Sequence, residues 1–174
     1  RPSVSELPEL PEVAMLLVGH GRVEAAFEDA AAAGVRSFIV PGLGAEAGEE
    51  GREIAARMAS RARSLGASVL GPNCMGVAVP GGSSFYIGTV TDAVNSGHVS
   101  VVAQSGSIAD GLLALGPRVG FRCIVSSGGE AVTDTADFLA FLAGDDETRS
   151  IGLFLETVRR PGAFAAALGL CSEA

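Results

Sequence analysis

Residues 98–109, which read HVSVVAQSGSIA, decide how this chain folds. The apolar run 99–103 is typical of a buried strand, and the apolar stretch 108–115 predicts a helix. Small polar residues at 104–107 connect the two. Such a turn leaves backbone N–H groups free at the positive end of a helix, where an anion can bind. This stretch therefore predicts a strand, an anion-binding turn and a helix in succession.

The same alternation extends over the whole chain. Further strands are expected at 13–18, 37–40, 68–70, 122–126 and 151–155, and further helices at 23–33, 48–65, 133–142 and 161–170. Alternating strands and helices are typical of a parallel sheet covered by helices and joined by right-handed crossovers. We expect an α/β fold of two such units, with an irregular, Pro/Gly-rich break between them near residues 80–97.

The composition excludes several classes of function. The 174 residues are 48% hydrophobic and 18% charged, with a net charge of −8, which disfavours both disorder and binding to nucleic acid. No apolar run approaches the roughly 18 residues of a membrane span. Lysine is absent, so any phosphate must be bound by arginine, hydroxyl or backbone N–H groups. Three distant cysteines show no metal-ligand spacing and indicate a reducing, cytoplasmic compartment.

Two more segments are expected at the same sheet edge as the turn 104–107. The run 126–134, SSGGEAVTD, follows a strand and leads into a helix, and Glu156 ends the strand 151–155. Neighbouring parallel strands present their carboxyl ends at one edge, where ligands bind. Two helix N-termini there could share one dianion. Simpler interpretations remain open: serine as an ordinary helix cap, Gly-Gly as a plain turn, and Glu156 paired with Arg159 or Arg160.

Other patterns carry less weight. The run 71–76, GPNCMG, is either a structural turn or a place where Asn73 meets a ligand. His20 and His98 have no ligand-spaced partner and are expected to be structural or to face solvent. Both precede Ser105, and the turn lacks the glycines of a nucleophile elbow, so a hydrolase is disfavoured. No GxGxxG follows a strand, which disfavours an NAD-binding protein.

Taken in order, these segments resemble the nucleoside-diphosphate-forming acyl-CoA synthetases, which include the succinyl-CoA synthetase α subunit. GPNCMG, QSGS and the DDET before a strand ending in glutamate carry the resemblance. It implies the second half of a CoA-binding Rossmann-like domain at 1–80 and a linker at 81–97. It also implies a truncated flavodoxin-like, succinyl-CoA-ligase-type domain at 98–174.

The resemblance also implies roles for individual residues. Ser105, Gly106 and Ser107 would face the phosphate of a phosphohistidine, and Ser127 and Gly128 would lie nearby.

Three other positions match the CoA site of this family, and one matches its catalytic glutamate. Asn73 and Cys74 match residues that line the CoA site, and Glu46 matches the acid of its glycine-rich turn. Glu156 matches the catalytic glutamate that orients the phosphohistidine.

The expected reaction ligates a carboxylic acid to CoA with ATP, through an acyl phosphate. The resemblance places the phosphohistidine beyond residue 174 and the nucleotide site in another domain, so the chain is expected to be a fragment. Its partners would be the acid, CoA, and missing domains or a β-like nucleotide-grasp subunit, with a homo-oligomer possible. The alternative is a non-catalytic module of a larger protein that binds CoA or acyl-CoA.

Overall fold

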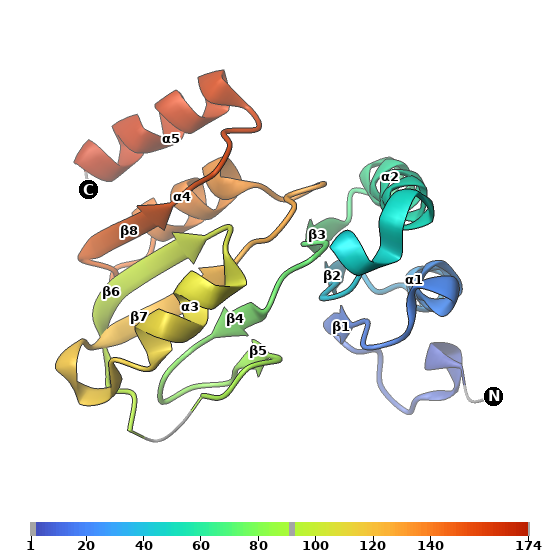
Figure 1. Ribbon diagram of the computed structural model, residues 1–174, viewed down its shortest axis with the longest axis horizontal. Helices are drawn as coiled ribbons and strands as arrows, with labels where there is room; N and C mark the ends of the chain where they lie inside the picture. The colour runs from blue at the N-terminus through green and yellow to red at the C-terminus, as the bar shows by residue number, and fades with distance from the viewer. Residues whose placement is uncertain (1–2, 91–92, 174) are drawn as a thin grey trace.

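The computed structural model describes residues 3–90 and 93–173, which form two β-sheets covered by helices (Figure 1). The first sheet is parallel, in the order β1-β2-β3. Its elements are η1 (Val4–Glu6, a 3-10 helix), β1 (Val13–Met15), α1 (His20–Ala33), β2 (Ser37–Ile39), η2 (Ala45–Ala47, a 3-10 helix), α2 (Gly48–Ser64) and β3 (Ser68–Leu70). The βαβαβ order expected for this part of the chain is confirmed.

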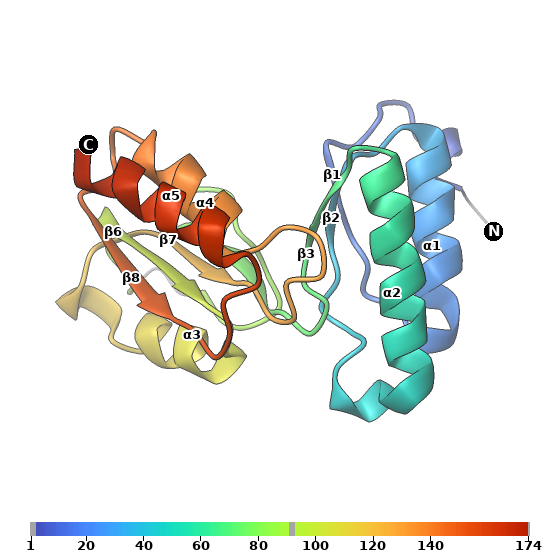
Figure 2. The ribbon, with the colours of Figure 1, turned by 90° about the horizontal axis from the view of Figure 1, so that it is seen from above.

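Helices α1 and α2 lie side by side on the face of the first sheet that is turned away from the second sheet (Figure 2). Helix α2 buries Ile54, Met58 and Ala62, which are four residues apart and so fall on one side of the helix. From α1, the ring of Phe27 packs against that of Phe38 in β2, with centroids 4.5 Å apart. The apolar residues whose spacing predicts these helices are therefore the residues that the helices bury.

The second sheet has five strands in the order β5-β4-β7-β6-β8. They are β4 (Gly76–Ala78), β5 (Phe85–Tyr86), β6 (Ser96–Ala103), β7 (Phe121–Ser126) and β8 (Ser150–Phe154). Strands β7, β6 and β8 run parallel, whereas β4 pairs antiparallel with both β5 and β7. The parallel part is the α/β unit that the sequence predicts for residues 98 onward.

Four helical segments accompany this sheet, namely α3 (Gly106–Leu113), η3 (Gly116–Arg118, a 3-10 helix), α4 (Thr135–Ala143) and α5 (Pro161–Glu173). Helix α3 covers one face of the sheet, while α4 and α5 lie on the other (Figure 2). Among the described residues, no helix is both long and apolar enough to cross a membrane.

Strand β4 is the main departure from the expected layout. Because β4 pairs with β7, through Val77 opposite Val125, the chain passes from the first sheet to the second between Leu70 and Gly76. This point lies before the expected break at residues 80–97. A three-residue apolar run carries no information about which distant strand it will join. The division into domains at 1–80, 81–97 and 98–174 remains a prediction, and residues 91–92 of that linker lie outside the described residues.

A buried apolar cluster joins the two units. Ile39 of β2 and Leu70 of β3 belong to the same cluster as Cys74, Val102 and Val125. The face of the first sheet that α1 and α2 leave free is thus covered by the second unit. This contact fixes the position of the turn at 71–76 relative to the ends of β6 and β7.

Candidate functional site

The carboxyl ends of β6, β7 and β8 lie together at one edge of the second sheet. Ala103, the last residue of β6, is in register with Ser126 of β7 and with Phe154 of β8. The segments that follow these strands are 104–107, 127–134 and 155–160, and they contain the residues singled out from the sequence. Their proximity follows from the parallel topology.

Gln104 joins all three of these segments through its side-chain amide. Its Oε1 accepts hydrogen bonds from the backbone N–H groups of Glu156, at 2.7 Å, and Thr157, at 2.9 Å. Its Nε2 donates to the carbonyl oxygen of Thr157, at 2.7 Å, and to Oε2 of Glu130, at 2.9 Å. Gln104 is buried, and this one side chain ties the end of β6 to the segment after β8.

Glu130 is a buried carboxylate directly behind Gln104, with 4% of its surface exposed. Its Oε1 accepts hydrogen bonds from the hydroxyl groups of Ser127, at 2.8 Å, and Thr135, at 2.6 Å. Sequence reasoning did not select Gln104 or Glu130 as site residues. The available signal was that both are large polar residues directly beside buried strands or their turns, where burial requires hydrogen-bonding partners.

The N-terminus of α3 is open to a ligand. Ser105 occupies the N-cap position, but its hydroxyl makes no capping hydrogen bond and lies instead 3.0 Å from the hydroxyl of Ser107. The capping interpretation is therefore right about the position of Ser105 and wrong about its hydrogen bond. The first N–H groups of a helix have no partner within the helix. Those of Gly106 and Ser107 thus lie at a helix start without a side-chain cap.

Helix α4 does not contribute a second free N-terminus. It begins at Thr135, and Asp134 caps it by accepting from the backbone N–H of Ala136, at 2.9 Å, and of Asp137, at 3.4 Å. Arg160 pairs with Asp134 at 2.6 Å and holds the pKa of this carboxyl group below its ordinary value. The expectation that two helix ends share one anion is therefore wrong for α4, because a carboxylate of the chain already occupies that end.

Ser127 and Gly128 have other contacts at this edge. Ser127 is fully buried, and its hydroxyl donates to Glu130. Gly128 has a φ of +61° and lies so close to the carbonyl oxygens of Pro72 and Asn73 that a Cβ would collide with them. Neither residue offers a side-chain donor to solvent, so neither can bind a phosphate through its side chain.

Glu156 lies at the same edge with its carboxylate exposed. Arg159 donates to the carbonyl oxygen of Gly129, at 2.9 Å, and Arg160 is paired with Asp134. Within residues 3–90 and 93–173, the Glu156 carboxylate forms no ion pair. The alternative in which Glu156 pairs with a neighbouring arginine is therefore wrong, and its carboxylate remains free to act on a ligand.

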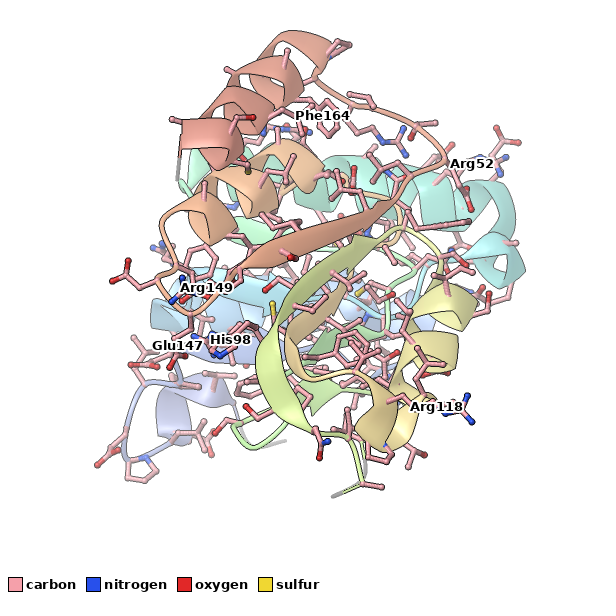
Figure 3. All side chains as sticks on the ribbon, turned by 90° about the vertical axis from the view of Figure 1, so that its left-hand side faces the viewer. Arg52, His98, Arg118, Glu147, Arg149 and Phe164 are labelled. Carbon is pink, nitrogen blue, oxygen red and sulfur yellow. The ribbon has the colours of Figure 1, made fainter. Side chains whose placement is uncertain are left out.

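The two histidines lie away from this edge. His98 is in the first half of β6, close to the start of β8 and beside Glu147 and Arg149, and its Nδ1 is 2.8 Å from the carbonyl oxygen of Glu147 (Figure 3). His20 is the first residue of α1, in the other unit. This agrees with the expectation that both are structural or face solvent.

A second group of predicted residues meets at the turn after β3. Glu46 accepts from the backbone N–H of Gly44, at 3.0 Å, and a Cβ on Gly44 would lie 2.6 Å from Oδ1 of Asn73. Glu46 and Asn73 are both exposed there. Cys74, in contrast, is buried, its thiol faces the carbonyl oxygens of Val40 and Leu70, and burial raises its pKa to about 11.

The expectation that Cys74 lines a ligand site is therefore wrong, because its side chain packs in the core.

The loop between β7 and α4 connects the two predicted sites. Its backbone runs along β3, with the N–H of Gly129 donating to Pro72, at 2.7 Å, and that of Ala131 donating to Gly71, at 3.0 Å. Thr133 extends the pairing, since its N–H donates to the carbonyl oxygen of Val69 and its hydroxyl accepts from the N–H of Val69. The segment that holds Glu130 is thereby attached to the first unit.

A groove of about 770 Å³ lies elsewhere, between α4, α5 and β8. Leu139, Leu168 and Cys171 contribute to its walls, and none of the residues predicted from the sequence lines it. No group of three histidine, cysteine, aspartate or glutamate side chains that could hold a metal ion occurs among the described residues.

Comparison with known proteins identifies the family. Residues 96–174 match the succinyl-CoA ligase like flavodoxin domain. Over 162 residues, the chain is 32% identical to the α subunit of an ADP-forming acetate–CoA ligase I from Pyrococcus furiosus, covering 90% of this chain and 34% of that one. It is 33% identical over 171 residues to a trans-feruloyl-CoA synthase from an unknown prokaryotic organism, covering 94% of this chain and 24% of that protein.

Solved structures agree with this relationship. An acetyl-coenzyme A synthetase 1 of Candidatus Korarchaeum cryptofilum, in its apo form, superposes with a TM-score of 0.88 at 31% identity. The match covers 98% of this chain and 38% of that one. A structure of the same enzyme in complex with phosphate and ADP gives a TM-score of 0.85.

Residues 96–174 are thus a succinyl-CoA-ligase-like flavodoxin domain. The chain as a whole is similar to ADP-forming acetate–CoA ligases and acetyl-coenzyme A synthetases, and it spans about a third of the length of the Pyrococcus furiosus relative.

Proposed function

We propose that the protein containing this chain ligates a carboxylic acid to CoA with ATP, through a phosphohistidine and an acyl phosphate. ATP would transfer its γ-phosphoryl group to a histidine nitrogen and leave as ADP. The phosphoryl group would then pass to the carboxylate of the acid. Finally, the CoA thiol, after losing its proton, would attack the acyl carbon and release inorganic phosphate.

The observation that carries this proposal is the pairing of two groups at one sheet edge. The uncapped N-terminus of α3 lies after β6, the exposed carboxylate of Glu156 lies after β8, and Gln104 bonds directly to the Glu156 backbone. One group suits the phosphoryl oxygens and the other suits the imidazole. A phosphorylated histidine needs both.

Each group has a defined chemical task. Backbone N–H groups of Gly106 and Ser107, with the hydroxyls of Ser105 and Ser107, would bind the phosphoryl oxygens. The helix dipole would add about 0.3–1 kcal/mol, or more where the site excludes water. Glu156 would accept the N–H of one imidazole nitrogen and so leave the other nitrogen unprotonated for the phosphoryl group. The histidine itself would come from outside this chain, because His20 and His98 lie elsewhere.

The turn around Asn73 would contribute to the CoA site. The Asn73 amide can both donate and accept, and Glu46 lies beside it at Gly44, where any side chain would fill the space between them. These polar, exposed groups fit a ligand rich in amide and hydroxyl groups. The thiol of Cys74 has no part in this binding.

The remaining parts of the proposal concern partners. The nucleotide site would belong to a nucleotide-grasp domain or subunit, and the protein would work in the cytoplasm, with homo-oligomers possible. The acid stays open, because the relatives act on acids as different as acetate and trans-ferulate, by their names. A non-catalytic CoA-binding module is not favoured, since the relatives found are ligases.

The test uses the intact protein and ATP labelled on its γ-phosphate. We expect acid-labile, base-stable label on the protein, as for a phosphohistidine. Changing Glu156→Gln removes the negative acceptor and should slow labelling by about tenfold or more, because an imidazole in the wrong tautomer is a poor nucleophile.

The matched control is Asp146→Asn, which removes a charge from an exposed loop at the opposite end of β8 and should leave labelling unchanged. Label of normal stability and rate in the Glu156 variant would exclude the orienting role. Absence of label from the unchanged protein would exclude the reaction.

A further inference from the structure

Glu130 has no role in the function proposed above, yet it is buried and both oxygens of its carboxylate accept hydrogen bonds. Three neutral donors surround its carboxylate, from Ser127, Thr135 and Gln104. A buried carboxylate is costly unless it is hydrogen-bonded, and this one is bonded on both oxygens. Because a neutral side chain would avoid this cost, we look for a role of Glu130 other than stabilising the fold.

The orientation of the Gln104 amide points to such a role. Its oxygen faces two N–H donors, from Glu156 and Thr157, and its NH₂ group faces two acceptors, Glu130 and the Thr157 carbonyl. A flipped amide would set NH₂ against two N–H groups and oxygen against a carboxylate and a carbonyl. The backbone groups of Glu156 and Thr157 already favour this orientation, and Glu130 adds a fourth hydrogen bond that a flipped amide would lose.

Glu130 is itself held firmly. The residues on either side of it, Gly129 and Ala131, donate their backbone N–H groups to Pro72 and Gly71 of the other unit. Glu130 has a φ of +51°, an uncommon conformation that these contacts and its own hydrogen bonds maintain. A group with this support can act as a fixed reference for a neighbouring side chain.

We propose that Glu130 is a positioning residue for Glu156 and acts through Gln104. By accepting from Nε2, Glu130 keeps the Gln104 oxygen directed at the N–H groups of Glu156 and Thr157. This fixes the backbone from which the Glu156 carboxylate projects. The inference rests on the proposed function, to which it adds the means by which an exposed carboxylate on a loop keeps the geometry needed to orient a histidine.

Exchanging the two side chains tests this relation. Gln104→Glu places a second carboxylate against Glu130, so the two acceptors repel and side chain 104 should leave its place. Glu130→Gln alone is mild, because its amide oxygen can face Gln104 and its NH₂ can donate to the hydroxyls of Ser127 and Thr135. In the double variant, the amide introduced at position 130 donates to the carboxylate introduced at position 104. One oxygen of that carboxylate can again accept from the Glu156 and Thr157 N–H groups, whereas the other faces the Thr157 carbonyl oxygen, so the recovery should be partial.

The first measurement is hydrogen–deuterium exchange of the intact protein, resolved to the amides of Glu156 and Thr157. We expect Gln104→Glu to accelerate exchange of both amides at least about tenfold and the double variant to restore part of the protection. The second measurement is the rate of phosphoryl labelling, which should fall about tenfold to a hundredfold in Gln104→Glu and recover in the double variant.

A second pair of variants, Gln104→Met alone and Gln104→Met with Glu130→Gln, tests the proposal if Gln104→Glu does not fold. Gln104→Met is uncharged, of similar length, and removes all four hydrogen bonds of the Gln104 side chain. It should accelerate exchange at Glu156 and Thr157, and adding Glu130→Gln should then change nothing at these two amides, because the connection through residue 104 is already broken.

The outcomes separate the two proposals. A double variant no better protected than Gln104→Glu, or an effect of Glu130→Gln that persists beside Gln104→Met, would overturn the positioning role. Recovery of protection from exchange at Glu156 and Thr157, together with recovery of the labelling rate, supports the positioning role. If the unchanged protein takes up no label, the proposed function fails, whereas the exchange data still decide whether Glu130 controls the Glu156 backbone.

Discussion

We predict that the side chain of Asp134 holds the start of α4 in place. Its side chain is 3% exposed and does two things: it caps α4 through the N–H groups of Ala136 and Asp137, and it pairs with Arg160 through both oxygens, at 2.6 and 2.8 Å. Asp134→Ala removes the cap and the ion pair together. Asp134→Asn keeps an oxygen for the cap and removes the charge. The two variants therefore separate the two contributions.

The expected magnitudes follow from burial. Loss of a helix cap costs about 1 kcal/mol. Arg160 is half exposed and can turn to solvent, so its pair with Asp134 contributes at most about 1 kcal/mol. We therefore expect Asp134→Ala to lower the free energy of unfolding by about 2 kcal/mol and Asp134→Asn by about 1 kcal/mol or less.

Urea unfolding followed by circular dichroism measures both values, provided that the slopes with denaturant agree. Arg160 holds the pKa of Asp134 below its ordinary value, so the stabilisation by the charge is fully present above about pH 4. It is lost as the pH falls through the lower pKa of the folded state, and the difference between wild type and Asp134→Asn should shrink on acidification below about pH 4.

Equal losses in the two Asp134 variants at neutral pH would show that the cap contributes nothing. A loss below about 0.5 kcal/mol for Asp134→Ala would refute the reasoning altogether.

Two other changes separate stability from function. Gly128→Ala places a side chain at φ +61° against the carbonyl oxygens of Pro72 and Asn73. It should lower the free energy of unfolding, measured with urea, by about 1–2 kcal/mol or more. The control Gly111→Ala, in α3 with open space around it, should be stabilising by up to about 1 kcal/mol, and equal effects at both positions would contradict the close approach at Gly128. Ser105→Ala should alter the urea midpoint by the equivalent of less than about 0.5 kcal/mol, because its hydroxyl makes no capping bond, yet it should slow phosphoryl labelling of the intact protein. A large loss of stability with normal labelling would show that Ser105 is only a cap.

Much of the fold was predictable because it depends on residues close together in the chain. Hydrophobic period and turn glycines located most of the helices and strands, as at Gly34, where a φ of +112° ends α1 at the residue expected. The alternation also implied parallel strands, and parallel strands bring residues 104–107 and Glu156 to one edge. These inferences needed no knowledge of distant contacts.

The errors concern contacts between distant parts of the chain. The run 126–134 was expected to bring a free helix N-terminus to the anion, but Gly128 and Gly129 pack on the turn at Pro72 and Asp134 caps α4. Cys74 follows an exposed asparagine in the sequence but points into the core. In both cases the neighbouring unit determines which groups are covered, and no local pattern describes that unit.

The amino-acid sequence determined the α/β class, the small-residue turn before α3 and the presence of a carboxylate after β8, because backbone propensity and periodicity act over a few residues. Only the folded chain decided that Gln104 pairs with Glu130 and that Asp134, the cap of α4, pairs with Arg160. Those partners are 26 residues apart in each case, Gln104 from Glu130 and Asp134 from Arg160. The physical reason is that a buried polar group is satisfied by whatever packing brings within about 3 Å of it, and packing is a property of the whole fold.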